Sequence, residues 1–402
     1  SCFPSNMSIS FRTAFLRHVG QTSPEPDGFE VGYGEGIFLF DMEGIPFIDC
    51  ISGIAVSSLG HGHPRIKDAI RKQLDLHLHT MVYGEHVQVP QVALAERLAQ
   101  LLPAELDCTF FTSSGTEAVE GALKAARKYT SRYEIIACRQ AYHGSTAGAE
   151  SLRSDLTHIA GARPLVPGVM HIDFNDFDGL VKISDHTAAI IMEPVQGEAG
   201  AIVPSAGYLR AVRDRCHETG TLLILDEIQT GMGRTGSMWA FQQEEVIPDI
   251  LLLAKAFGGG LPLGAFISSQ KIMKVLSHDP ILGHLTTFGG HPLSCAAGLE
   301  AINILEENHL PARAVSLERI IRKKLEHHWA LREVRGRGLM LALELKNPDN
   351  LFPAVKACRN EGLLVDWFLF NNRSLRFAPP LIISEEEVNL VCSKLVRALD
   401  SL

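Results

Sequence analysis

The chain has 402 residues, 46% of them hydrophobic and 21% charged, a composition typical of a globular protein of about two or three domains. Its 37 basic and 46 acidic residues give a net charge of −9 without a basic run, which excludes nucleic acid and anionic membranes as expected partners. No apolar stretch approaches the roughly eighteen residues of a transmembrane helix. The eight cysteines are scattered without a Cys-x-x-Cys pair, which favours a reducing, cytoplasmic location.

The N-terminal region is predicted to contain a helix and a small antiparallel meander. Phe11, Phe15, Leu16 and Val19 fall on one helical face. Apolar runs at 36–40 and 45–49 flank the turn sequence Asp-Met-Glu-Gly, as expected for two strands of a hairpin.

From about residue 91 the pattern alternates between helices and strands. Such alternation predicts the α/β class, with a large, mostly parallel sheet covered by helices on both faces. The expected helices span 91–102, 115–128 and 207–219, and the expected strands span 108–112, 135–138, 188–193, 221–226, 250–254 and 264–268.

The pattern changes after a helix expected at 292–307. A long amphipathic helix, short strands and a last helix predict a smaller α+β domain, at 311–330, 338–346, 362–366, 374–378 and 385–401. We therefore divide the chain into an N-terminal arm and meander that pack with the small domain, a large domain, and a C-terminal small domain. Their expected ranges are 1–55, 56–305 and 306–402.

Lys255 and Asp226 each stand at the carboxyl end of an apolar strand, where open α/β sheets bind their ligands. An amine that forms imines and a carboxylate that pairs with a pyridinium are the groups that pyridoxal phosphate chemistry requires. Ile228 is placed to press on the ring, and Gln229 to reach its phenolic oxygen. The alternative, a metal-binding Asp-Glu pair of Walker B type, lacks the accompanying Gly-x-x-x-x-Gly-Lys loop.

Two hydroxyl-rich turns enter helices and are candidate phosphate sites. Residues 112–117 (Thr-Ser-Ser-Gly-Thr-Glu) place Ser114, Gly115 and Thr116 at a helix start, where free amides attract anions. An ordinary capping box from Ser114 to Glu117 is the alternative. Thr287 lies in the second turn, for which a plain helix-start turn is the alternative.

Four further side chains are expected near the same cleft. Tyr142 can stack on a flat ring and His143 can stand at its edge, although simple packing explains both equally well. Glu193 ends a strand before a proline, and its alternative is a solvated strand-end acid. Arg376, flanked by apolar residues, suggests bidentate capture of a carboxylate, against a structural ion pair.

The histidines do not predict a metal centre. His61 and His63, like His77 and His79, have loosely metal-like spacing but no third ligand nearby in the sequence. We therefore expect no bound metal.

Together these motifs resemble the class III (ω-type) aminotransferases of the fold-type I pyridoxal phosphate enzymes and, within them, the acetylornithine and ornithine aminotransferases. The resemblance runs from about residue 11 to 400. It rests on Leu-Gly-His-Gly-His-Pro at 59–64, Ser-Gly-Thr-Glu at 114–117, Tyr-His-Gly at 142–144, Glu-Pro-Val-Gln-Gly-Glu at 193–198, Asp-Glu-Ile-Gln-Thr-Gly at 226–231, Lys255 with its glycine-rich bend, Thr-Phe-Gly-Gly at 287–290 and Arg-Phe-Ala-Pro-Pro at 376–380.

The resemblance implies a homodimer with shared active sites that binds pyridoxal 5′-phosphate. Lys255 would form the internal aldimine and move the proton between the substrate Cα and C4′ of the cofactor. The remaining cofactor contacts would be Asp226 to the ring nitrogen, Tyr142 and Ile228 on the two ring faces, His143 and Gln229 at its edge, and Ser114, Gly115 and Thr116 to the phosphate, together with Thr287 of the partner subunit.

The same resemblance implies ping-pong transfer of an amino group from an ω-amino donor, acetylornithine-like or ornithine-like, to 2-oxoglutarate. Arg376 would bind the α-carboxylate of glutamate or 2-oxoglutarate, and Glu193 would pair with Arg376 while an ω-amino substrate is bound. An aminomutase or decarboxylase on the same fold is the alternative, followed by a non-catalytic binding protein.

The chain departs from the family pattern at two positions. Ser145 stands where members acting on ornithine-like donors usually carry the arginine that holds the distal carboxylate, and Arg153 or Arg163 are the candidates to replace it. His291 stands in place of the usual asparagine before the proline of the second phosphate turn.

Overall fold

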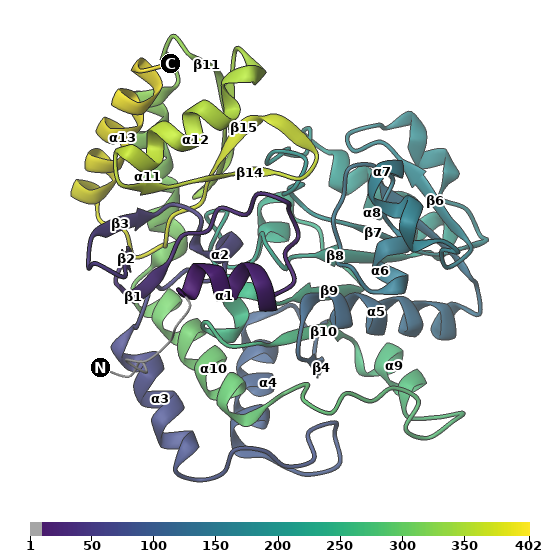
Figure 1. Ribbon diagram of the computed structural model, residues 1–402. Coiled ribbons are helices and arrows are strands. Elements are labelled where there is room, and N and C mark those ends of the chain that lie inside the picture. Colours follow the sequence, from purple (N-terminus) through teal and green to yellow (C-terminus); the bar gives the residue numbers. More distant parts are fainter. Residues whose placement is uncertain (1–9) are drawn as a thin grey trace.

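The computed structural model describes residues 10–402 and contains three β-sheets flanked by helices (Figure 1). Residues 1–9, the beginning of the predicted N-terminal arm, lie outside the described residues. The predicted N-terminal helix is α1 (Phe11–His18), which begins where the Ser10 hydroxyl accepts a hydrogen bond from the Thr13 amide. None of its residues is buried. No helix within residues 10–402 has the length and apolar composition needed to cross a membrane.

The largest sheet has seven strands in the order β4-β10-β9-β8-β7-β5-β6. Strand β10 is antiparallel to both of its neighbours, and the other pairs are parallel, which confirms the mostly parallel sheet. Edge strand β6 was not anticipated, because its four residues show neither strict alternation nor a continuous apolar run. The strands are β4 (Cys108–Thr112), β5 (Glu134–Cys138), β6 (Val169–Ile172), β7 (Thr187–Met192), β8 (Leu222–Asp226), β9 (Ile250–Leu253) and β10 (Gly264–Ser268).

Both faces of this sheet are buried because successive strand residues point to opposite sides. Leu223 and Leu251 belong to a core that includes α4, α8 and α10, whereas their neighbours Ile224 and Leu252 belong to a second core with α5, α6 and α9. The first group comprises α4 (Val89–Leu101), α8 (Tyr208–Thr219) and α10 (Pro292–Glu307), and the second α5 (Gly115–Thr130), α6 (Ala147–Ser151) and α9 (Gln270–Met273). The other helices of this part of the chain are α2 (Ser52–Ala55), α3 (Pro64–Leu74) and α7 (Leu156–Ile159).

The C-terminal region forms an antiparallel sheet in the order β11-β12-β15-β14, covered by three helices. The helix predicted for 311–330 was too long: it ends at Leu325, and residues 331–337 form a strand that was missed. That strand forms a tight hairpin with β12 across a turn at Gly338, where the glycine adopts a positive φ, and this hairpin was not recognised in the sequence. The elements are α11 (Leu310–Leu325), β11 (Leu331–Arg337), β12 (Met340–Leu345), α12 (Leu351–Asn360), β14 (Asp366–Phe368), β15 (Asn371–Phe377) and α13 (Glu385–Asp400).

The predicted meander consists of β1 (Val31–Glu35), β2 (Phe38–Asp41) and β3 (Pro46–Asp49). At its turn, Asp41 Oδ1 accepts hydrogen bonds from two amides two and four residues on, at 3.0 and 2.8 Å. Strand β3 pairs in parallel with β13 (Leu363–Leu364), so the meander shares a sheet with the C-terminal region. The domain boundaries at 55 and 305 stay a prediction.

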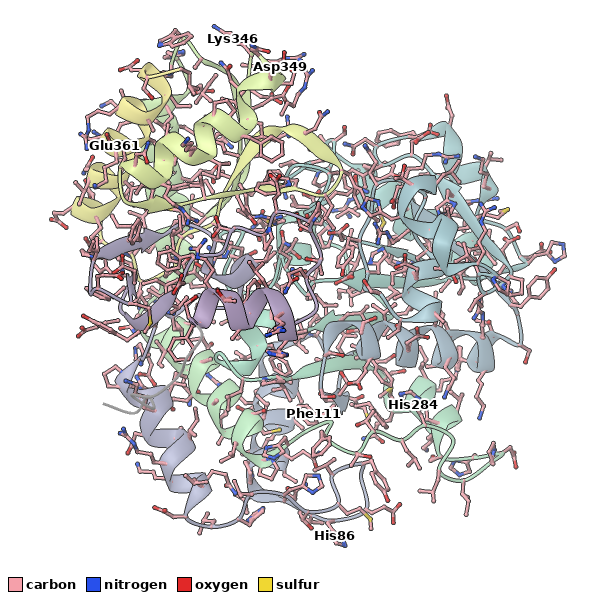
Figure 2. All side chains as sticks on the ribbon, viewed as in Figure 1. His86, Phe111, His284, Lys346, Asp349 and Glu361 are labelled. Atoms are coloured by element: carbon pink, nitrogen blue, oxygen red, sulfur yellow. The ribbon has the colours of Figure 1, made fainter. Side chains whose placement is uncertain are left out.

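Figure 1 shows the C-terminal elements gathered at one end of the molecule, at the upper left, and the large sheet beside and below them. Figure 2 marks the two regions by side chains: Lys346, Asp349 and Glu361 lie on the C-terminal elements, and His86 and His284 lie at the opposite end.

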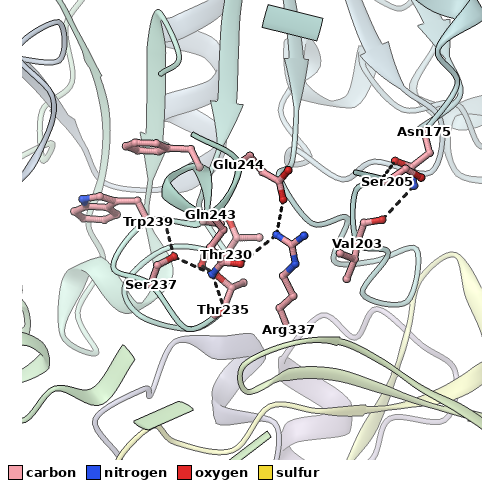
Figure 3. Close-up of polar contacts among 12 residues, drawn as sticks. Asn175, Val203, Ser205, Thr230, Thr235, Ser237, Trp239, Gln243, Glu244 and Arg337 are labelled. Carbon is pink, nitrogen blue, oxygen red and sulfur yellow. Dashed lines mark hydrogen bonds and ion pairs between the residues drawn. The ribbon is translucent and has the colours of Figure 1, made fainter. Parts of the chain in front are cut away.

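Buried polar contacts fix the C-terminal sheet against the loops that follow β8. The Arg234 guanidinium, 1% exposed, donates to the carbonyl oxygens of Leu339 and Pro379 at 3.1 and 2.6 Å and to the Ser58 hydroxyl at 2.8 Å. Burial lowers the pKa of Arg234 to about 9. Nearby, the guanidinium of Arg337 at the end of β11 pairs with a carboxylate oxygen of Glu244 at 2.7 Å (Figure 3).

Replacing Arg234 by methionine should destabilise the protein by on the order of 2 kcal/mol, because buried acceptors lose their donor. Calorimetry of the cofactor-free protein should show a melting temperature several degrees lower. Arg319→Met, on an exposed position of α11, is the matched control. Equal melting temperatures for the two variants would contradict this role for Arg234.

Candidate active site

The predicted site residues meet at the carboxyl ends of adjacent strands. In the large sheet, β5, β7, β8 and β9 are neighbours and run in parallel, so the side chains that follow them converge on one edge. A cavity of about 370 Å³ lies there, and Lys255 and Asp226 both line it. The other predicted residues that line it are Ser114, Gly115, Thr116, Tyr142, His143, Glu193, Ile228 and Gln229.

Asp226, the last residue of β8, is buried and fully engaged. Its Oδ2 lies 2.6 Å from His143 Nδ1, and its Oδ1 accepts a hydrogen bond from the Ile228 amide at 3.0 Å. Burial alone would lower the pKa of His143, but the hydrogen bond and charge of Asp226, with the charge of Glu193, raise it. This pairing was not predicted, because 83 residues separate the two side chains in the sequence.

Glu193, which follows β7, is also buried but contacts amides rather than a cation. Its carboxylate accepts from the Gly197 amide at 3.0 Å and from the Tyr142 amide at 3.4 Å. Burial raises the pKa of Glu193 to about 7, although the charge of His143 opposes the shift. Glu193 does not pair with Arg376 in this structure, and its pairing while an ω-amino substrate is bound stays a prediction.

Glu198 is the carboxylate that pairs with Arg376. The two terminal guanidinium nitrogens of Arg376 each lie 3.0 Å from one Glu198 oxygen, and Nε lies 2.9 Å from Asp366 Oδ1. The guanidinium also stacks 4.5 Å from the ring centre of Phe368. Burial alone would raise the pKa of Glu198, but Arg376 lowers it, so the carboxylate is charged.

Sequence reasoning missed Glu198 although it lies in the same motif as Glu193. Strand periodicity stops at Pro194, and the loop that follows turns back on itself, with the amide of Gln196 bonded to the carbonyl of Ile202. The only feature of the sequence that pointed to Glu198 was that it is a second glutamate, five residues after Glu193. Arg376 itself does not line the cavity, but its partner Glu198 does.

Lys255 begins a short 3₁₀ turn (Lys255–Gly258) after β9, with a backbone φ of +50°. Such a left-handed conformation is uncommon for a residue with a side chain and is typical of functional positions. Burial lowers the pKa of Lys255, against the charges of Glu198, Asp226 and Glu193. Within residues 10–402, no hydrogen bond or ion pair holds its Nζ, which leaves the amine available as a nucleophile.

The start of α5 is capped and is also the candidate anion site. The Ser114 hydroxyl accepts from the Glu117 amide at 3.3 Å, whereas the Glu117 carboxylate reaches back to the Ser113 amide at 2.7 Å. The first helical bond runs from the Ala118 amide to the Ser114 carbonyl. The amides of residues 115 and 116 precede it and are free for an anion.

These features fit pyridoxal phosphate. The cavity volume lies in the range of small-molecule sites, roughly 300–1,000 Å³. A Cβ on Gly115 would lie 2.8 Å from Ile228 Cδ1, so the absence of a side chain keeps the cradle between the helix start and Ile228 open. His143 Nε2 is buried and lacks a hydrogen-bond partner within residues 10–402. Phosphate would lie at the amides of α5, and the ring beside Asp226 and Lys255.

Thr287 does not line this cavity. It lies on an exposed turn before α10, and its carbonyl oxygen is 2.8 Å from His79 Nε2. A role for Thr287 at its own subunit's cavity has no support in this arrangement.

Residues 23–399 match the family model of the class III aminotransferases over nearly the whole chain. The chain belongs to this family. It is 40% identical to the acetylornithine aminotransferase of Methanocaldococcus jannaschii, over 91% of each chain. It also resembles the ornithine aminotransferase of Toxoplasma gondii (TM-score 0.90, 31% identity, 97% and 94% of the two chains) and an amine transaminase from an uncultivated Pseudomonas species (TM-score 0.87, 29% identity, 96% and 98%).

This class III aminotransferase therefore has the predicted fold-type I architecture and is a transaminase. Enzymes of the family depend on pyridoxal phosphate, and one structure of the Toxoplasma relative is described with partial occupancy of that cofactor.

Ser145, which stands where related enzymes usually carry an arginine, forms a contact between two neutral hydroxyl groups. Ser145 Oγ lies 3.2 Å from the Tyr142 hydroxyl. Arg153 stacks 5.8 Å from the centre of the Tyr142 ring, but its Nε and one terminal nitrogen are bound by Asp155 at 3.0 and 3.2 Å. Arg163 is exposed and does not line the cavity. Neither Arg153 nor Arg163 lines the cavity of this structure.

The raised pKa of Glu193 predicts a pH-dependent effect of Glu193→Gln in the cofactor-free protein. The folded-state pKa, about 7, lies above the ordinary 4.5, so the folded protein binds this proton more tightly than the unfolded chain. The contribution of Glu193 to stability is thus fully present below about pH 4.5 and is lost as pH rises through 7. The variant should gain stability relative to the unsubstituted protein over this window, by on the order of 2 kcal/mol.

Thermal melts from pH 5 to pH 8 measure this difference. Glu326→Gln, at an exposed position just after α11, serves as the control whose difference stays constant with pH. Parallel pH profiles for the Glu193 variant and the unsubstituted protein would show that Glu193 titrates normally.

Proposed function

We propose that this aminotransferase moves an amino group from an ω-amino donor, of acetylornithine or ornithine type, to 2-oxoglutarate, with pyridoxal phosphate held in the cavity between Asp226 and Lys255. The observation that carries the proposal is the buried pairing of Arg376 with Glu198 at the wall of that cavity. Arg376 can bind a carboxylate of one substrate, and Lys255, whose pKa is lowered, can react with the amino group of the other. This combination suits a reaction with two different substrates.

Bound pyridoxal phosphate supplies an electron sink that stabilises negative charge on the substrate carbon beside the amine. Lys255, whose pKa is lowered by burial, provides a neutral amine to link to the cofactor and then to carry the proton at that carbon. Asp226, oriented by His143 and by the Ile228 amide, would hold the ring nitrogen protonated. Tyr142 and Ile228 would confine the ring from its two faces.

Arg376 and Glu198 distinguish the two half-reactions. Within residues 10–402, Arg376 is the only arginine that forms an ion pair with a carboxylate lining the cavity, that of Glu198. With an ω-amino donor bound, Glu198 remains paired with Arg376 and neutralises its charge. The carboxylate of 2-oxoglutarate has the same bidentate geometry and would displace Glu198. Once released, Glu198 loses the cation that lowers its pKa, so we expect it to take up a proton in this buried position.

We also propose a homodimer in which Thr287 reaches the cofactor phosphate of the partner subunit. Its exposed turn, away from its own cavity, supports this arrangement. The seven cysteines among the described residues are unpaired thiols, which supports a reducing, cytoplasmic location.

A donor screen tests the reaction. Purified protein loaded with pyridoxal phosphate should form glutamate from 2-oxoglutarate with at least one ω-amino donor, among them acetylornithine, ornithine and simple amines. Lys255→Ala should bind the cofactor without a borohydride-reducible link and form no glutamate. A cofactor-loaded, yellow protein that forms glutamate from none of the donors would contradict the assignment.

Substitutions on the two sides of the ion pair should shift the KM for 2-oxoglutarate in opposite directions. Arg376→Ala removes the bidentate contact and should raise this KM at least roughly tenfold. Glu198→Gln removes the competing carboxylate and should lower it. Steady-state kinetics at saturating donor measure both, and the rate of the donor half-reaction in single turnover is the internal control. A KM raised equally by both variants would show a structural ion pair only.

A further inference from the structure

The loop between α3 and α4 is tied to the turn that carries Thr287. His79 Nε2 lies 2.8 Å from the carbonyl oxygen of Thr287, so the ring donates this hydrogen bond. The His79 ring also lies 5.1 Å from the ring of Phe288 and 5.8 Å from that of His291, centre to centre. One side chain thus contacts three residues of the turn, although the two segments are 208 residues apart.

We propose that His79 is a positioning residue that fixes this turn so that Thr287 can bind the cofactor phosphate of a second copy of the chain. The inference rests on the proposed function, in which the phosphate site is shared between subunits. The proposal adds His79, which lies outside the cavity and acts on phosphate binding by orienting the turn that carries Thr287.

The inner side of the turn is already held by its own backbone. The Gly289 amide donates to the Thr286 hydroxyl at 3.0 Å, and a Cβ at Gly289 would lie 2.4 Å from the Phe111 carbonyl oxygen. The His291 amide donates to the Phe288 carbonyl at 3.1 Å. These contacts anchor residues 286 and 289–291 against the end of β4, but they leave the peptide after Thr287 to be oriented by His79.

His291 supports the same arrangement from the helix side. Its Nδ1 accepts a hydrogen bond from the Leu293 amide at 3.3 Å, which places the ring proton on Nε2 and caps α10. The ring is thereby fixed as a surface on which His79 stacks. No three His, Cys, Asp or Glu residues within 10–402 are arranged to hold a metal ion, so a metal does not explain this histidine cluster.

A second copy of the chain is the occupant that fits this face. Thr287 is exposed and does not line the cavity of its own subunit, so its hydroxyl is available to a cavity of a second subunit. A groove of about 1,320 Å³ lies beside it, lined by α3, the loop that carries His79, and α10. Large apolar side chains are exposed along the same loop, Leu76 at 75% and Val87 at 92%, which marks a protein interface.

The test compares pyridoxal phosphate with pyridoxal, which lacks the phosphate. Dissociation constants are measured by absorbance or fluorescence titration of the cofactor-free full-length protein. His79→Ala should weaken pyridoxal phosphate about fivefold, the loss expected for one hydrogen bond, and leave pyridoxal unchanged. His79→Gln, which keeps a donor, should recover part of the loss.

His86→Ala is the matched control. His86 lies on the same loop (Figure 2), but its Nδ1 bonds to the Thr80 hydroxyl and not to the turn. This variant should bind both ligands as the unsubstituted protein does. Light scattering after size-exclusion chromatography shows whether each variant keeps its oligomeric state.

Thr287→Ala separates failure of this inference from failure of the proposed function. If Thr287→Ala binds pyridoxal phosphate normally, the shared phosphate site is wrong. If Thr287→Ala weakens it but the His79 variants do not, only the role of His79 is overturned. Equal losses for pyridoxal phosphate and pyridoxal in His79→Ala, or in His79→Gln should the alanine variant fold poorly, would also overturn it.

Discussion

The hydrogen bond between Asp226 and His143 is the interaction on which the active site depends. The bond is 2.6 Å long and lies buried at the end of β8. An unpaired carboxylate there would cost folding free energy, and His143 supplies its partner. Glu193, beside it, contacts amides and has a raised pKa instead. Burial also lowers the pKa of Lys255. Burial at one sheet edge therefore sets the charge states of the groups that would meet the cofactor.

The ion pair of Arg376 with Glu198 joins two parts of the chain at this edge. Arg376 lies on β15 of the C-terminal sheet, and Glu198 lies on the loop after β7 of the large sheet. Asp366, on the neighbouring strand β14, holds the guanidinium from the other side. The arginine that we propose to bind a substrate carboxylate is thus held where the two sheets meet, and Arg234 and the pair of Arg337 with Glu244 connect the same two parts of the chain.

The two turns that we propose to bind phosphate differ in how far their structure follows from the local sequence. The turn at 113–117 is a helix start whose capping and free amides follow from its own sequence. The turn at 286–291 is contacted by His79, far away in the chain, and its exposed Thr287 does not line the cavity of its own subunit. A turn can therefore be recognised in the sequence, while its position relative to the cavity depends on residues far away in the chain.

The sequence by itself determined the alternation of buried strands and helices, the convergence of Lys255, Asp226, Tyr142 and Ile228, and the capped helix start of α5. Strand periodicity and the parallel order carry that information, because side chains after adjacent parallel strands must meet. Only the tertiary structure decided that Glu198 rather than Glu193 pairs with Arg376, that His143 is the partner of Asp226, and that residues 331–337 form a strand. The first two depend on contacts between segments far apart in the chain, and the third on a hairpin with the next strand whose turn was not recognised.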